Sequence, residues 1–167
     1  YQKINTMKGK IKAISNKKNR GKGYSVKKGM AFSDGDYVLY IDADNSTTIE
    51  HFSRAMPYIE DGEAIIIGSR NPKDAQGAKK KVRQRKIKEI FGIIGNRIIQ
   101  LLTYRGIWDT QCGFKILRKD LANKAVDKIT TDRWLFDVEI LLVARGLGEN
   151  IKIIPVEWYN HGESNVG

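Results

Sequence analysis

The sequence has few of the residues from which disulfide frameworks and soft metal sites are built. Its 167 residues include one cysteine, Cys112, and two histidines. A single cysteine excludes an intramolecular disulfide framework and a cysteine-rich zinc site, and it favours a reducing compartment. The small number of histidines argues against a histidine-based metal cage.

Long apolar runs are also absent. No run approaches the roughly 18 residues that are needed to cross a bilayer, and the N-terminal segment does not have the pattern of a signal peptide. Hydrophobic residues still make up 41% of the chain, which is enough for a buried core at a length typical of one domain. The composition therefore predicts a soluble or surface-bound α/β domain.

Acidic residues are outnumbered by basic ones, 19 to 30, which gives a formal net charge of +11. A surplus of this size predicts an anionic partner: nucleic acid, a phosphorylated substrate or an acidic membrane face. Residues 79–88 are strongly basic and lead into the most apolar predicted helix. They are either a solvated face or a basic amphipathic segment that lies on an anionic membrane or grips a phosphate group. Nucleic acid is less favoured, because this helix is poor in base-stacking aromatics.

Alternation and helical periodicity predict strands that alternate with helices along the chain. The predicted strands are residues 10–15, 37–41, 64–67, 113–117 and 151–156. The predicted helices are residues 25–33, 47–60, 82–104 and 136–145, with a short one that begins at Asp120. This order is typical of a layered α/β sheet, in which ligands bind beyond the carboxyl ends of the strands.

Asp42 and Asp44 directly follow the predicted strand 37–41. Alternation places their side chains on the same side of an extended segment, where two carboxylates repel each other unless a cation neutralises them. A hard divalent ion with oxygen ligands, such as Mg²⁺ or Mn²⁺, would relieve this repulsion and could hold a diphosphate. In the alternative interpretation, the segment is an ordinary acidic turn in which Asp44 caps the next helix.

Gly21-Lys22-Gly23 is a short glycine-rich segment before the first predicted helix. Glycine lets a backbone approach a ligand closely, and Lys22 would place one ammonium group beside it, as phosphate-binding loops do. The spacing is neither that of a P-loop nor that of the Gly-x-Gly-x-x-Gly fingerprint. A flexible basic turn is the alternative interpretation.

Two segments in the second half of the chain hold further candidates. Residues 109–115 are turn-like, and their Cys112 is interpreted as a small buried thiol, because no histidine is near in the sequence. In residues 133–139, Asp137 is consistent with a charge in the first turn of a helix. Glu139 lies in an apolar run, where an unpaired buried carboxylate is costly.

Taken together and in order, these segments resemble glycosyltransferase family 2, and most closely its dolichyl-phosphate β-glucosyltransferase and polyprenyl-phosphate glycosyltransferase branch. The resemblance covers roughly residues 10–165, and the segments that carry it are residues 19–23, 35–44, 68–70, 105–115, 133–139 and 155–158, with Gly162 and Ser164. It implies an α/β GT-A (nucleotide-diphospho-sugar transferase) fold with a Rossmann-like, three-layer mixed sheet. Residues 1–167 would form one partial catalytic domain without the first strands, since nothing before Lys10 matches the family's opening strand and loop. A domain with these ends could be inactive by itself.

On the donor side, the resemblance implies a nucleotide-sugar that is held through Mg²⁺ or Mn²⁺. Asp42 would lie against the nucleotide, Asp44 would ligate the metal together with Asp42, and Ser46 would be a further ligand. The residues that would approach the donor nucleotide are Gly21, Lys22 and Gly23.

On the acceptor side, the resemblance implies a cationic site for a lipid phosphate. Arg70, with Arg83 or Arg85, would bind this phosphate. The residues that would line the sugar and acceptor side are Asp109, Gln111, Arg133 and Trp134.

The function implied is an inverting transfer of a hexosyl group, most readily glucose from UDP-glucose, to a dolichyl or polyprenyl phosphate at a membrane surface. The acceptor phosphate is already an anionic nucleophile, so no strong general base is required. The implied location is the cytoplasmic face of a membrane, either the endoplasmic reticulum of a eukaryote or the plasma membrane of a prokaryote. No nucleic acid is expected as a partner. Two alternatives stay open: mannosyl transfer from GDP-mannose to the same lipid, and a non-catalytic basic domain that binds nucleic acid or anionic lipid.

Overall fold

A mixed four-stranded sheet forms the centre of the computed structural model, which describes residues 12–80 and 106–159. Its strands lie in the order β1 (Tyr37–Ile41), β4 (Phe114–Arg118), β2 (Ile65–Ser69) and β5 (Ile151–Pro155). Strand β4 runs antiparallel to both β1 and β2, and β5 runs parallel to β2. Strands β1, β2 and β5 therefore end at the same edge, at which β4 begins. We call this the strand-end edge.

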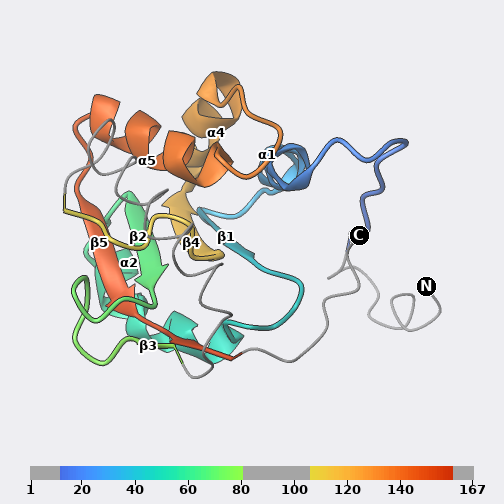
Figure 1. Cartoon of the computed structure of the whole chain (residues 1–167). Coiled ribbons are helices and arrows are strands. Elements are labelled where there is room, and N and C mark those ends of the chain that lie inside the picture. The colour runs from blue at the N-terminus through green and yellow to red at the C-terminus, as the bar shows by residue number, and fades with distance from the viewer. Residues whose placement is uncertain (1–11, 81–105, 160–167) are drawn as a thin grey trace.

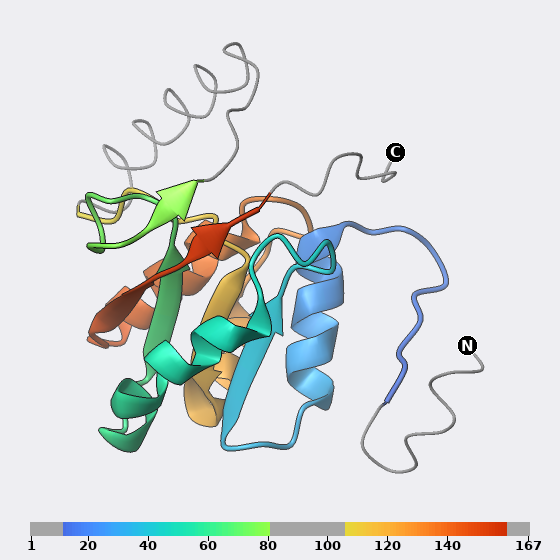
Figure 2. The same cartoon turned by 90° about the horizontal axis from the view of Figure 1, so that it is seen from below.

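Helices cover both faces of the sheet (Figures 1 and 2). Helices α1 (Lys22–Phe32), α4 (Lys119–Lys128) and α5 (Phe136–Gly146) lie on one face. The short 3₁₀ helix η1 (Ile49–Arg54) and helix α2 (Met56–Glu60) lie on the other. Strands β3 (Lys79–Lys80) and β6 (Glu157–Trp158) form a separate parallel pair. The layered α/β arrangement predicted from the sequence is confirmed.

The two faces of the sheet carry separate hydrophobic cores, because successive side chains of a strand point in opposite directions. In β2, Ile65 and Ile67 pack under α1, α4 and α5, whereas Ile66 packs towards η1 and α2. All three are fully buried, as expected for a strand with helices on both sides. In β4, the same alternation places Lys115 on the α5 face, at a position otherwise taken by apolar residues.

Most predicted elements are confirmed within a few residues, and three differ. Residues 12–15 form no strand; their alternation of charged and apolar residues is not matched by a pairing partner, and Ile14 is exposed. The helix predicted over residues 47–60 is split into η1 and α2, because Pro57, which lacks an N–H, stands in the first turn of α2.

Helix α1 begins earlier than predicted, at Lys22. The backbone of Gly21 has φ 106°, a left-handed conformation that suits glycine, and this residue is the N-cap. Ser25, the predicted start, lies inside the helix, and its hydroxyl donates to the carbonyl of Gly21. The helix predicted over residues 82–104 lies outside the described residues.

Candidate functional site

Asp42 stands directly after β1, at the strand-end edge. Its backbone N–H donates to the carbonyl of Gly113 at 3.0 Å, which ties the end of β1 to the residue before β4. A Cβ atom added at Gly113 would overlap the Asp42 carboxylate. The absence of a side chain at Gly113 therefore makes the room in which this carboxylate lies.

Lys22 is the direct partner of Asp42. Its Nζ lies 2.6 Å from Asp42 Oδ1, and the two side chains are 25% and 32% exposed. The same Nζ lies over the rings of Trp134 and Phe136, at 5.7 and 5.5 Å from their centroids. The family resemblance implied that Lys22 and Asp42 belong to one donor site. The structure brings their side chains into contact, with Lys22 in the first turn of α1 and Asp42 directly after β1.

Gly21 and Gly23 are needed for a close approach between two parts of the chain. A Cβ at Gly21 would lie 2.6 Å from the Asp132 carbonyl oxygen, and one at Gly23 would lie 2.7 Å from that of Thr131. The N–H of Tyr24 donates to the same Asp132 oxygen at 3.0 Å. The space beside both glycines is thus filled by residues 131–133, and the predicted approach of these glycines to a donor nucleotide stays a prediction.

Asp44 and Ser46 form a tight turn after Asp42. Asp44 Oδ1 accepts a hydrogen bond from the N–H of Ser46 at 2.9 Å, and Asn45 between them has φ 54°. Asp44 is exposed, whereas Ser46 is buried and its carbonyl accepts from the N–H of Tyr159. Asp44 does not cap η1, whose N-cap is Thr48 without a side-chain cap. Its carboxylate is accessible from solvent.

The side chains at this edge supply only some of the oxygen ligands that a hard divalent ion needs. Within residues 12–80 and 106–159, no cluster of three or more histidine, cysteine, aspartate or glutamate side chains could hold a metal. The carboxylates of Asp42 and Asp44 remain, one partly and one well exposed. Mg²⁺ is commonly bound by one or two carboxylates together with water and substrate phosphates. These residues therefore fit a metal that is completed by the diphosphate of a ligand.

Arg70, directly after β2, is held by Asp109. Its Nε and Nη2 donate to the two carboxylate oxygens of Asp109 at 2.8 and 2.7 Å, and its backbone N–H donates at 2.8 Å. Burial alone would raise the pKa of Asp109, but the hydrogen bonds and charge of Arg70 outweigh it and hold the pKa below its usual value. Burial opposes the charge of Arg70 as well, yet the hydrogen bonds and charge of Asp109 raise its pKa, and the charge of Asp42 adds a smaller effect in the same direction.

Asp74 is a site-organising residue that the sequence prediction missed. Its carboxylate accepts from the backbone N–H groups of Trp108 and Asp109 at 2.7 and 2.8 Å, and from the Ser69 hydroxyl at 2.6 Å. It thereby fixes the segment around Asp109 against the end of β2. Asp74 stands in a polar segment whose composition gives no sign of such a role.

Cys112 and Gln111 complete this part of the strand-end edge. Cys112 is fully buried, so the predicted small buried thiol is confirmed, and burial raises the pKa of this thiol to about 11. Gln111 is exposed beside it.

A buried charge network lies behind the edge, and the sequence prediction did not identify it. Lys115 Nζ lies 2.7 Å from Asp137 Oδ1 and donates to the carbonyl of Cys112 at 2.7 Å, and the hydroxyl of Tyr40 donates to the same Asp137 oxygen. Burial, followed by the charge of Asp137, raises the pKa of Tyr40 well above its usual value. The available signal was a lysine within the apolar strand Phe-Lys-Ile-Leu, where alternation reserves a core position.

Glu139, which was conspicuous in its apolar run, has four hydrogen bonds. Its carboxylate accepts from the N–H and hydroxyl groups of Thr130 and Thr131, at 2.7 to 3.1 Å. Burial would raise the pKa of Glu139, but these bonds lower it. The residue therefore anchors the loop before α5.

The remaining acceptor-side candidates lie on that loop or outside the described residues. Arg133 and Trp134 are both exposed, and Trp134 lies beside Lys22. Arg83 and Arg85 lie outside the described residues.

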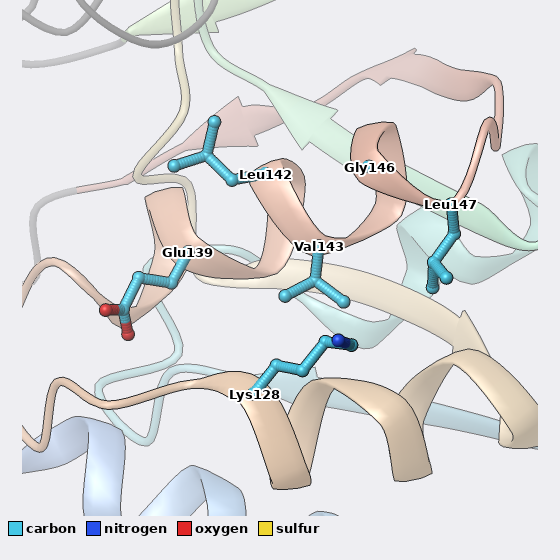
Figure 3. Close-up of a pocket in the computed structure, with 6 residues that line it drawn as sticks. All are labelled: Lys128, Glu139, Leu142, Val143, Gly146 and Leu147. Carbon is cyan, nitrogen blue, oxygen red and sulfur yellow. The ribbon is translucent and has the colours of Figure 1, made fainter.

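A shallow groove between α4 and α5 lies apart from these residues (Figure 3). It is lined by Lys128, Glu139, Leu142, Val143, Gly146 and Leu147. Of these, Glu139 faces the preceding loop through the bonds described above. None of the predicted donor or acceptor residues lines this groove.

Comparison with known proteins gives the family. A model described as glycosyl transferase family 2 matches residues 1–125. The chain belongs to glycosyltransferase family 2. The resemblance seen in the sequence segments is confirmed.

Two relatives in this family are named for the same activity. The chain is 37% identical over 153 residues to the dolichyl-phosphate β-glucosyltransferase of Dictyostelium discoideum, covering 89% of this chain and 46% of that protein. It is 33% identical over 161 residues to a dolichyl-phosphate β-glucosyltransferase of Trichomonas vaginalis, covering 93% and 47%. The chain therefore spans just under half the length of these relatives.

Solved structures give the fold. Glucosyl-3-phosphoglycerate synthase from Mycobacterium tuberculosis, solved with Mn²⁺, UDP-glucose and phosphoglyceric acid, matches with a TM-score of 0.55 at 15% identity, over 84% of this chain and 48% of that one. Mannosyl-3-phosphoglycerate synthase from Rubrobacter xylanophilus matches with a TM-score of 0.53 at 21% identity, over 86% and 45%. The predicted GT-A fold is confirmed. Among the described residues, no helix combines the length and apolarity that spanning a membrane requires.

Proposed function

We propose that this chain forms part of a transferase that moves glucose from UDP-glucose to the phosphate of a dolichyl or polyprenyl phosphate at a membrane surface. The observation that carries the proposal is the position of Asp42 and Asp44 at the strand-end edge, with Lys22 2.6 Å from Asp42. Relatives more than 30% identical to the chain are named dolichyl-phosphate β-glucosyltransferases, which supports the choice of sugar and acceptor.

Asp42 and Asp44 are the residues that would hold a divalent ion, Mg²⁺ or Mn²⁺. When bound, such an ion neutralises negative charge on a departing diphosphate. Asp44 offers an exposed carboxylate, and its hydrogen bond from the Ser46 N–H fixes one carboxylate oxygen. The backbone of Asp42 is fixed by its bond to Gly113, where the absence of a side chain leaves room for the Asp42 carboxylate.

Lys22 contributes a cation that can change partner. In the structure it neutralises Asp42, but both side chains are partly exposed, so the pair is open to solvent and to ligands. A diphosphate that enters beside Asp42 would offer Lys22 oxygen atoms of higher negative charge. Lys22 would thereby help to hold the donor and its leaving group.

Arg70 contributes the acceptor side. Asp109 fixes its Nε and Nη2 in a bidentate pair in which Nη1 takes no part, and 24% of the side chain is exposed. A guanidinium that is oriented in this way can bind a phosphate oxygen without losing much conformational freedom. Arg70 would therefore place the acceptor phosphate in line with the anomeric carbon.

The reaction is a single displacement. An acceptor phosphate oxygen forms the bond to the anomeric carbon while the bond from that carbon to the diphosphate oxygen breaks. The electron pair of the broken bond leaves with the nucleoside diphosphate. One displacement inverts the configuration at the anomeric carbon, and because the acceptor is an anion, no proton has to be removed by the protein.

A transfer assay tests the proposal. The complete transferase that contains this chain is incubated with dolichyl phosphate, Mn²⁺ and labelled UDP-glucose or GDP-mannose, and the lipid product is measured. We expect glucosyl transfer that needs the divalent ion and falls at least about a hundredfold in Asp44→Ala. Asp127→Ala, which removes an exposed carboxylate from α4, is the matched control and should retain activity.

Other outcomes count against the proposal in distinct ways. Turnover of GDP-mannose alone would refute the glucosyl assignment and support mannosyl transfer. Metal-dependent transfer that survives in Asp44→Ala would refute the role of Asp44. Absence of transfer from either donor, combined with metal-independent and strongly salt-dependent binding to DNA duplex, would favour a non-catalytic basic domain.

A further inference from the structure

The loop between α4 and α5 presents large apolar side chains to solvent. Trp134 is 70% exposed and Leu135 is 53% exposed. Trp134 is the most exposed large hydrophobic residue in the part of the chain that the structure describes. We call residues 129–135 the Trp134 loop. Side chains of this size are costly in water, so their exposure calls for a physical explanation.

The Trp134 loop is anchored firmly at its base. Glu139 accepts four hydrogen bonds from Thr130 and Thr131, and the Asp132 carbonyl accepts the N–H of Tyr24 at the start of α1. Gly21 and Gly23 allow the start of α1 to approach the loop closely. Because the backbone is fixed on both sides, the fold itself holds Trp134 and Leu135 outward.

Cationic side chains lie in the Trp134 loop and at the start of α1 beside it. Arg133 is exposed in the loop itself. Arg20 is paired with Asp132 at 2.8 Å while its side chain stays 55% exposed, and Lys22 Nζ lies 5.7 Å from the centroid of the Trp134 ring. Lys17 and Lys18, in the segment before α1, are exposed as well. Asp132 is the acidic residue of the loop, and both Arg20 and Lys27 pair with it.

Exposed tryptophan and leucine with cations nearby suit the boundary between lipid headgroups and acyl chains. Tryptophan is favoured at headgroup level, leucine is favoured below it, and lysine and arginine are attracted to anionic headgroups. The net charge of +11 adds a longer-range attraction of the same sign. A neutral protein partner would leave these cations without a counterpart.

We infer that the Trp134 loop, together with Arg20 and the segment before α1, is the surface by which this protein docks on an anionic lipid bilayer. The inference rests on the proposed function, since it supplies the membrane contact of that same site. Lys22 joins the two, because it contacts the ring of Trp134 on one side and the carboxylate of Asp42 on the other. Docking through this loop would therefore bring Asp42, at the strand-end edge, towards the membrane surface.

Binding to vesicles tests the inference. The full chain is sedimented with phosphatidylcholine vesicles that contain or lack phosphatidylserine, without donor, acceptor or metal. We expect binding that needs phosphatidylserine, weakens with added salt, and falls about tenfold or more in Trp134→Ala/Leu135→Ala. The matched control is Leu142→Ala/Leu147→Ala, which removes two exposed leucines from the groove of Figure 3 and should bind as the unchanged chain does.

Fluorescence gives a second measurement that does not depend on loss of binding. The chain has three tryptophans, so Trp108→Phe/Trp158→Phe leaves Trp134 as the single emitter. Its emission should move to shorter wavelength and become quenchable by brominated lipid when anionic vesicles are added. An unchanged Trp134 spectrum, wild-type binding in Trp134→Ala/Leu135→Ala, or an equal loss in the control would overturn the inference. Since no donor or acceptor is present, each of these results leaves the transferase proposal standing, and failure of transfer leaves the docking result unaffected.

Discussion

Two lysine–aspartate pairs of nearly equal length have opposite surroundings in this molecule. Lys22 and Asp42 lie 2.6 Å apart with side chains 25% and 32% exposed, whereas Lys115 and Asp137 lie 2.7 Å apart with side chains 0% and 2% exposed. The buried pair has further partners in the carbonyl of Cys112 and the hydroxyl of Tyr40. The exposed pair is bordered by the rings of Trp134 and Phe136 and by solvent.

The difference in burial separates a structural pair from a binding pair. A buried ion that loses its partner keeps the full cost of desolvation, so Lys115 and Asp137 have no alternative to each other. An exposed pair gains little free energy from its own attraction and can exchange partners at low cost. Lys22 can therefore exchange Asp42 for an anion, and Asp42 can exchange Lys22 for a cation. A site for a metal-bound diphosphate requires this property.

The largest expected effect comes from breaking the buried pair. Lys115→Met leaves the Asp137 carboxylate and the Cys112 carbonyl without their cation, and it should lower the free energy of unfolding by about 3–5 kcal/mol. Urea denaturation at neutral pH measures this loss. The compensated variant Lys115→Met/Asp137→Leu/Tyr40→Phe removes the charges and the hydroxyl together and should recover most of the stability. A compensated variant as unstable as Lys115→Met alone would show that packing, rather than the unpaired charge, causes the loss.

The Arg70–Asp109 pair is intermediate in burial, with side chains 24% and 10% exposed. The pH dependence of its contribution to stability can be tested. The pKa of Asp109 is lower in the folded chain than its ordinary value of 3.8. The pair therefore stabilises the fold fully above that value, and the stability is lost as the pH falls through the lower, folded pKa. Arg70→Met should cost about 2 kcal/mol at neutral pH, and this deficit should shrink below pH 3.8.

Urea denaturation of the unchanged chain and of Arg70→Met, from neutral to acidic pH, measures this difference in the free energy of unfolding. The direction in which this difference changes with pH is informative, because without Arg70 the burial of Asp109 would raise the pKa of Asp109 and favour its protonated form. A deficit that is the same in acid and at neutral pH would indicate that Arg70 acts by packing alone.

A smaller effect is expected where Gly113 makes room for the Asp42 carboxylate. In Gly113→Ala, the added Cβ would overlap that carboxylate, and the forced displacement should cost about 1–2 kcal/mol. Gly29→Ala is the matched control, since Gly29 lies within α1 and an added Cβ would meet nothing within 4 Å. The control should stabilise the chain by about 0.5–1 kcal/mol. Thermal denaturation separates the two, and equal shifts would contradict the close contact at Gly113.

The order of strands and helices could be predicted from the sequence, because each element carries a local signal. The run Tyr37–Ile41 and the run of isoleucines in β2 are β-branched or aromatic, and the prediction of both strands is confirmed. The strand predicted over residues 10–15 was wrong where it can be judged, at residues 12–15, because alternation alone does not supply a partner. The early start of α1 depends on a glycine packing against a loop more than a hundred residues away, as the separation of Arg20 from Asp132 shows.

The candidate site could be located from the sequence but not assembled. Asp42 was identified because it follows a buried strand, where ligands bind in such sheets, and Arg70 was identified through the family resemblance. The partners that hold them could not be identified, because the Arg70–Asp109 bond joins residues 39 positions apart and the role of Asp74 depends on backbone N–H groups. Lys115 was overlooked for a related reason: its position in an apolar strand was a signal, but its acidic partner, Asp137, lies 22 positions away in the sequence.

The most direct test of the central claim is a calorimetric titration of UDP-glucose into the complete transferase that contains this chain, with and without Mn²⁺. Asp44→Asn is compared with Asp127→Asn, which changes an exposed carboxylate on α4. The account predicts binding that requires Mn²⁺, weakens at least about tenfold in Asp44→Asn and is unchanged in Asp127→Asn. Equal affinity in the absence of Mn²⁺, or in Asp44→Asn, would contradict it.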